Sequence, residues 1–206
     1  MAFTDHYVPD NQPLVSDDPL LDQVDEISPG FTDFMRRHSG TSFNDGLYRV
    51  HAIDSIRPLT ALCLQAFPAY ENKILCFASS WLGEQFAINL TRRVDRRVVL
   101  MMDSGSGEVF EIPADFMEFH NSLLIDQKDE ILNTKFYEDW LNTGGRAPAH
   151  NECIGFKIPL FLNGTDDVAN LELIDMEVYW SIHAQLIEQT KDLPPGTKID
   201  KVTISD

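Results

Sequence analysis

Basic side chains are scarce in this sequence. Its 206 residues include 16 lysines and arginines against 33 aspartates and glutamates, which gives a formal net charge of −17 at pH 7. The shortage argues against sequence-independent binding to DNA or RNA, which needs lysine and arginine on the phosphates. It argues equally against docking on an anionic membrane surface. We therefore expect no nucleic-acid partner, no membrane partner and, for a protein partner, a basic surface.

Cysteines and long apolar runs are also in short supply. Cys63, Cys76 and Cys153 are odd in number and show no CxxC spacing, so we expect buried free thiols in a reducing compartment. No apolar stretch approaches the roughly 18–20 residues that span a bilayer. Residues 1–10 lack the basic start and the apolar core of a secretory signal. The sequence accordingly predicts a cytoplasmic location.

Motifs for catalysis or cofactor binding are missing as well. The six histidines show no metal-binding spacing, and neither GxSxG nor GxGxxG occurs. Cys76 lies inside an apolar strand pattern, where burial would raise its pKa. Cys153, at the start of a predicted strand and close to His150, is the least implausible nucleophile, but still a poor one. We predict no metal, no cofactor and no enzymatic activity. A hydrolase that uses Cys153 or a carboxylate pair such as Asp166 and Asp167 stays open as an alternative.

Enough apolar residues are present to build a core, since 43% of the chain is hydrophobic. Residues 1–28 differ from the rest, because they contain seven acidic residues, three prolines and no basic residue. We interpret them as an acidic, partly ordered N-terminal arm that forms at most one short helix near 18–26. Residues 29–206 are interpreted as one domain.

The hydrophobic periodicity of that domain predicts an α+β fold, with a mostly antiparallel sheet flanked by helices. Strands joined by short turns pair in antiparallel fashion. The arginine-rich stretch 92–97 falls between two predicted strands and marks a hairpin tip, with phosphate binding and contact to the acidic arm as alternatives. The expected strands are 47–51, 73–79, 84–89, 97–103, 108–112, 154–162 and 198–204, and the expected helices are 29–39, 54–67, 113–125, 129–142 and 175–189.

Candidate contact residues are aromatic side chains with acidic neighbours, because exposed tryptophan and tyrosine are typical of interface centres. For the adjacent pair at 179 and 180 we expect one side chain in the core and the other partly exposed, although core packing is the favoured interpretation for each aromatic taken singly. The predicted partner-binding residues are Trp81, Glu84, Asp166, Asp167, Asp175, Glu177, Tyr179 and Trp180.

Several longer stretches carry a family resemblance. They include 43–51 (FNDGLYRVH), 77–86 (FASSWLGEQF) and 107–121, and the strongest are 155–164 (GFKIPLFLNG) and 170–180 (NLELIDMEVYW). In this order they resemble, over about residues 29–204, the C-terminal domain of Tdi-type immunity proteins that neutralise type VI secretion DNase effectors. Relatives often have Gly-Gly where this chain has Asn163-Gly164, and asparagine tolerates the left-handed conformation of such a turn.

The resemblance implies a Smi/Knr-like α+β immunity fold and a cognate toxin as partner. Our leading hypothesis is an immunity protein that binds a secreted antibacterial toxin, a type VI DNase effector, and occludes its active site, as a monomer or in a 1:1 toxin complex. The alternative is a Smi/Knr-like scaffold or regulatory binding module without a toxin. The net charge is −7 in residues 1–30, +3 in 31–100 and −13 in 101–206, so we expect the contact surface in the arm or the C-terminal half.

Overall fold

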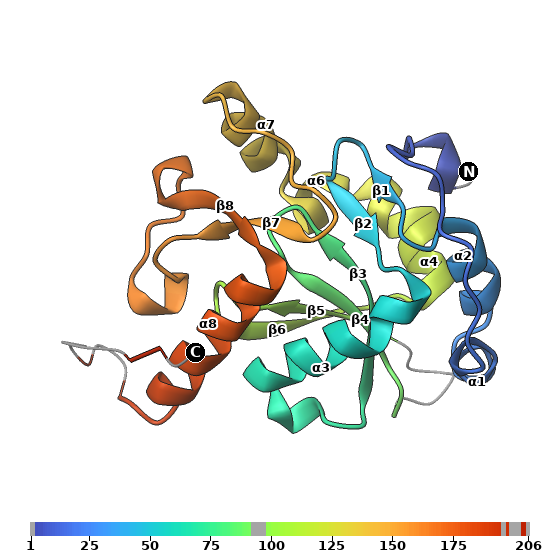
Figure 1. Cartoon of the computed structure of the whole chain (residues 1–206), viewed down its shortest axis with the longest axis horizontal. Coiled ribbons are helices and arrows are strands. Elements are labelled where there is room, and N and C mark those ends of the chain that lie inside the picture. The colour runs from blue at the N-terminus through green and yellow to red at the C-terminus, as the bar shows by residue number, and fades with distance from the viewer. Residues whose placement is uncertain (1–2, 92–97, 195–196, 198–202, 205–206) are drawn as a thin grey trace.

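The computed structural model describes residues 3–91, 98–194, 197 and 203–204, and its central element is an antiparallel sheet of six strands (Figure 1). Each strand pairs with its neighbour in the chain, so the order across the sheet is β1-β2-β3-β4-β5-β6. This architecture confirms the α+β class with a mostly antiparallel sheet flanked by helices. The strands are β1 (Ser42–Phe43), β2 (Tyr48–Val50), β3 (Ile74–Ser80), β4 (Gln85–Asn89), β5 (Val99–Asp103) and β6 (Glu108–Ile112).

A second, smaller sheet consists of β7 (Glu152–Phe156) and β8 (Leu171–Asp175), which pair in antiparallel register. The expected strand 154–162 is confirmed only over 154–156, and the strand at 171–175 was not expected. Beyond β7 the side chain of Asn170 replaces the strand partner, because it accepts from the Ile158 N–H (3.0 Å) and donates to the Ile158 carbonyl (2.9 Å). The strand therefore ends early, and a 3-10 turn follows at Leu160–Leu162.

Two long helices pack side by side on one face of the large sheet, α3 (Ile56–Ala66) and α8 (Met176–Thr190) (Figure 1). Both match expected helices to within two residues. Their core contacts are apolar: Cys63 and Trp180 are fully buried in one cluster with Cys76 on β3 and Met102 on β5. The helix-bearing face is therefore held by the burial of apolar surface, the dominant favourable contribution to folding.

Shorter helices cover the opposite face. The expected helix at 113–125 is interrupted, because a π turn at Phe119–Leu123 separates α4 from α5. Aromatic rings of this segment pack on the sheet, with Phe116 5.0 Å from Phe77 and Phe119 5.3 Å from Phe86 between ring centroids. The shorter helices in the described part of the chain are α1 (Leu20–Ile27), α2 (Phe31–His38), α4 (Phe116–Glu118), α5 (Leu124–Asp126), α6 (Lys128–Leu132) and α7 (Thr134–Asn142).

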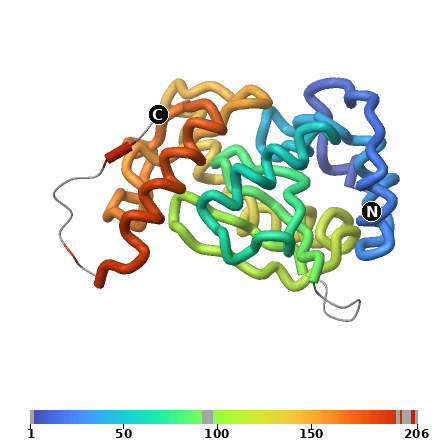
Figure 2. The backbone as a smooth tube through the Cα atoms, turned by 60° about the horizontal axis from the view of Figure 1, so that its bottom comes forward, coloured from blue at the N-terminus to red at the C-terminus, as the bar shows by residue number. Residues whose placement is uncertain are grey.

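The N-terminal segment packs against the same core. Phe3 and Tyr7 are buried and stack at 4.4 Å, and the Tyr7 hydroxyl donates to the Leu124 carbonyl at 2.7 Å. Leu14 and Val15, by contrast, are exposed. This segment and helix α8 lie at opposite ends of the molecule, as Figure 2 shows.

Two expectations fall on parts of the chain that the structure leaves largely undescribed. The arginine-rich stretch 92–97 lies outside the described residues, and of the expected strand 198–204 only Thr203 and Ile204 are described. All three cysteines are free and buried, as expected. None of the helices within the described ranges is both long and apolar enough to cross a membrane.

Candidate functional site

The structure buries all three aromatic residues that the sequence analysis selected as contacts. Trp81 and Trp180 are 0% exposed and Tyr179 is 3% exposed. The expectation that one residue of the pair 179–180 reaches the surface is therefore wrong. These aromatic side chains are not available to a partner in this conformation.

Hydrogen bonds explain why these large side chains lie inside. The indole N–H of Trp81 donates to the Leu132 carbonyl at 2.7 Å, and that of Trp180 donates to the Gly83 carbonyl at 2.9 Å. A buried tryptophan usually finds such a partner for its N–H. Trp81 thereby fixes the end of α6 to the sheet, and Trp180 fixes α8 to the turn between β3 and β4.

Glu84, another selected residue, is half-buried and poorly suited to present a negative charge. Burial, together with the charge of Asp103, raises its pKa to about 8. The pKa of Asp103 is also raised, chiefly by burial. Because like charges in a buried pair disfavour ionisation, the Glu84 carboxyl is mostly protonated at neutral pH. We therefore no longer expect Glu84 to act as an acidic contact for a basic partner.

We expect the substitution Glu84→Gln to stabilise the protein at alkaline pH. Between the ordinary value of 4.5 and about pH 8, only the unfolded chain ionises this carboxyl, so the free energy of unfolding falls as the pH rises. At about 1.36 kcal/mol per pKa unit, the variant gains roughly 1–4 kcal/mol at pH 9 and little at pH 4. Urea unfolding at both pH values measures the difference, and an unchanged pH dependence in the variant would contradict this assignment.

The remaining four selected acids fall into two groups. Asp166 and Asp167 are exposed in the turn after residue 162, where Asp167 caps the 3-10 turn Val168–Asn170. Asp175 and Glu177 lie at the start of α8, and the Asp175 carboxylate accepts from the N–H groups of Glu177 (2.9 Å) and Val178 (3.2 Å). Asp175 and Glu177 line one cavity, and neither Asp166 nor Asp167 is among the described residues that line it.

That cavity, which we call the acidic pocket, lies between the N-terminal ends of α3 and α8 and has a volume of about 400 Å³. Its floor comes from residues after β2 and near the end of β3, and its outer wall from the turn before β7. It is lined by His51, Asp54, Ser55, Pro58, Leu59, Ser79, His150, Asn151, Asp175, Met176 and Glu177.

A β-bulge gives the acidic pocket its polar floor. The register between β3 and β4 shifts between Cys76 and Ala78, and a bulge changes which side chains face each side of a sheet. As a result Ser79 lies on the same face as Cys76, beneath α3 and α8. Next to it, His51 Nε2 is 2.8 Å from Gln85 Oε1. Polar side chains thus occupy a part of this face where apolar ones would be expected.

The charges around the pocket are negative and have no basic counterpart in its wall. Its carboxylates are those of Asp54, Asp175 and Glu177, and no lysine or arginine is among the described residues that line it. Burial lowers the pKa of His51 to about 3, so its imidazole is neutral at pH 7. The pKa of His150 is also lowered, by partial burial and then by the charge of Arg49. At neutral pH the side chains that line the pocket therefore carry a net negative charge.

Catalytic geometry does not arise from these residues. His51 Nε2 is engaged with Gln85 and the Ser55 hydroxyl donates to Asp54, so within the described ranges neither serine of the pocket contacts a histidine base. Cys153, the nucleophile considered from sequence, is buried, and burial raises its pKa to about 12. No group of three potential metal ligands occurs in the described part of the chain.

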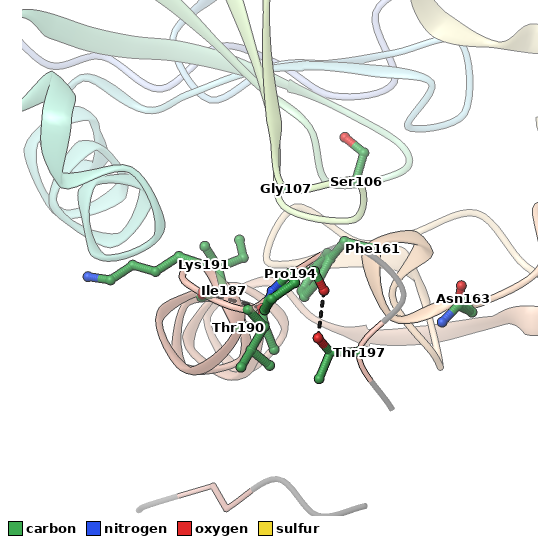
Figure 3. A pocket seen from close by; sticks show the side chains of 10 residues that line it. Ser106, Gly107, Phe161, Asn163, Ile187, Thr190, Lys191, Pro194 and Thr197 are labelled. Carbon is green, nitrogen blue, oxygen red and sulfur yellow. Dashed lines mark hydrogen bonds between the residues drawn. The ribbon is translucent and has the colours of Figure 1, made fainter. Parts of the chain in front are cut away.

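A second cavity of about 340 Å³, the C-terminal pocket, lies near the other end of α8 (Figure 3). Its wall includes Phe161, Ile187 and Lys191, and the Thr197 hydroxyl donates to the Pro194 carbonyl at 2.6 Å beside them. No carboxylate is among its described lining residues. Of these two cavities, the acidic pocket has the sign that a basic partner requires. A further cavity of about 390 Å³, beside α1 and α2, also has an acidic lining, formed by Asp22, Asp25, Glu26 and Asp33.

Of the residues that line the pocket, only Asp175 and Glu177 were selected from the sequence, and the polar residues that were missed include His51, Asp54, Ser79 and His150. One signal was present, because the apolar stretch 74–78 ends in two serines and is followed by Gln85, which is polar in an otherwise apolar strand. Asp54 was interpreted only as the start of a helix. Nothing in the sequence shows that Asp54 and Glu177, 123 positions apart, line one cavity.

Comparison with known proteins agrees with the resemblance. Residues 118–187 match the family model described as T6SS immunity protein Tdi1, C-terminal. The matched stretch runs from the end of α4 through most of α8 and includes Asp175 and Glu177. This match supports a type VI secretion immunity family and an immunity role. No curated protein matches the chain.

A solved structure has a similar fold. The crystal structure of Atu4351 from Agrobacterium tumefaciens superimposes with a TM-score of 0.62 at 18% sequence identity. The similarity covers 88% of this chain and 86% of that one. At this level of identity it supports the fold alone.

Proposed function

We propose that this chain, whose residues 118–187 match a type VI secretion immunity family, binds a cognate antibacterial toxin in the cytoplasm of the producing cell and neutralises it in a 1:1 complex. The single observation that carries the proposal further than the match is the acidic pocket, a cavity with three carboxylates and no basic wall residue among those described. The toxin surface that meets it is basic.

The proposed toxin is a DNase, and the proposed mode of inhibition is occlusion of its active site. A nuclease site is electropositive because it must hold phosphates. An acidic inhibitor complements that field, which raises the association rate and favours the correct partner. The acidic pocket and the exposed Asp166 and Asp167 supply the negative charge that such a partner requires.

Co-expression with the toxin encoded beside this chain tests the proposal. We expect the two proteins to elute together in gel filtration and cells that make both to keep intact chromosomal DNA. In cells that make the toxin alone, the chromosomal DNA should be degraded. Separate elution and no protection would contradict the proposal and favour the alternative of a binding module without a toxin.

A further inference from the structure

We infer that the acidic pocket is a receptor for one arginine side chain of a partner protein. The inference rests on the proposed function, in that it names the group through which the partner is recognised. It specifies a guanidinium, a planar cation with five N–H donors that suits several carboxylates at once better than the compact ammonium of lysine.

The first argument is the placement of acceptors on two walls. Asp54 comes from the turn that precedes α3, while Asp175 and Glu177 come from the start of α8. Asp175 is already engaged as the helix cap, and its other oxygen accepts from the Asn151 side chain at 3.1 Å. Glu177 is exposed and makes no side-chain hydrogen bond or ion pair with any described residue. Free acceptors on opposite walls fit a forked donor.

The second argument is a polar group with no partner on the floor. Ser79 is 2% exposed and lines the pocket, yet its hydroxyl forms no hydrogen bond within the described part of the chain. Buried polar groups are nearly always hydrogen-bonded, so a hydroxyl that faces a cavity points to a ligand or a water there. The imidazole of His51 beside it is neutral and so adds no positive charge, whereas the buried guanidinium of Arg49, opposite Ser79 in the register of β2 and β3, contributes one nearby.

The third argument is the chemistry of the remaining wall. Pro58 and Leu59 on α3 and Met176 on α8 present apolar surface to the same cavity. The methylene stem of an arginine buries against such surface while its charged head reaches polar groups. An anion is disfavoured by the three carboxylates. A metal ion is disfavoured because the described residues contain no group of three ligands that could hold one.

Titration of the isolated, isotopically labelled chain with small amides tests the inference. We expect Nα-acetyl-arginine amide to shift the backbone NMR signals of Ser79, Asn151 and Glu177. The neutral isostere Nα-acetyl-citrulline amide should leave them in place. The double variant Asp54→Asn with Glu177→Gln should lower the arginine affinity at least about fivefold. The matched double variant Asp126→Asn with Glu130→Gln, which neutralises two exposed acids at other helix starts, should keep it.

Three outcomes would overturn the inference: equal shifts with citrulline amide, an affinity that the pocket variant leaves unchanged, or tighter binding of Nα-acetyl-lysine amide than of the arginine probe. Because the titration contains no toxin, its failure leaves toxin neutralisation intact as a hypothesis. Conversely, failure of the co-expression experiment does not change the shifts that the probe produces.

Discussion

Replacing Arg49 with methionine is expected to lower the free energy of unfolding by about 2–4 kcal/mol. The Arg49 guanidinium is fully buried on β2, where it donates to the carbonyls of Ala149 (2.9 Å), Ser80 (2.6 Å) and Glu152. It thereby connects the large sheet to the start of β7. Methionine fills much of the space but leaves these carbonyls without the donor, and each buried group left unpaired costs about 1–3 kcal/mol.

Part of that loss is offset, because the buried charge of Arg49 is itself costly. Burial lowers its pKa to about 10, and no carboxylate is among the groups to which it donates. Urea unfolding of Arg49→Met and Arg49→Lys measures the balance, with the lysine variant expected in between because its ammonium has three donors but no fork. A methionine variant as stable as the wild type would show that Arg49 does not join the two sheets energetically.

Reversing the charge of the acidic pocket is expected to weaken toxin binding by at least about 100-fold. The double variant Asp54→Lys with Glu177→Lys places two cations where the proposed arginine binds, and like charges across an interface cost several kcal/mol. Both residues are exposed, so the fold should tolerate the change. The variant keeps Asp175, because its carboxylate caps α8 and the loss of a helix cap costs roughly 1 kcal/mol of stability.

The matched control carries the same change of charge on other helices. Asp126 and Glu130 are exposed acids in the first turns of α5 and α6, so Asp126→Lys with Glu130→Lys alters net charge and helix-dipole interactions alike. Binding measured by calorimetry should drop for the pocket variant and stay within a few-fold for the control. Equal losses in both variants would mean that overall charge, and not the acidic pocket, determines affinity.

Periodicity predicted the long helices α3 and α8 and the strands β3, β4 and β5 well, because each buries apolar residues at a regular spacing. The largely exposed strand β6 was predicted from the turn at 103–107 that precedes it. It failed where a single side chain decides the local structure. Asn170 replaces a strand partner beyond β7, and the short strand β8 has no run of apolar residues long enough to stand out. Likewise, Phe3 and Tyr7 secure a segment whose acids and prolines indicated an extended arm.

The candidate site was harder to predict than the fold. Glu177 and Asp175 were identified through their position near a tryptophan, but that tryptophan is buried, and the reason for selecting them was therefore wrong. What brings them to a site is α8 packing beside α3, together with the bulge that turns Ser79 into the cavity. The packing of α8 beside α3 and the position of the bulge depend on tertiary contacts that a single sequence does not reveal.

The most direct test of the central claim is hydrogen–deuterium exchange of the chain with and without its toxin. The account predicts slower exchange in the complex at residues 54–59 and 176–180, the two helix starts that enclose the acidic pocket. The C-terminal pocket, around Ile187 and Lys191, should exchange as in the free protein. Protection confined to that second pocket or to the N-terminal segment, with the acidic pocket unchanged, would contradict the claim that this protein recognises its toxin there.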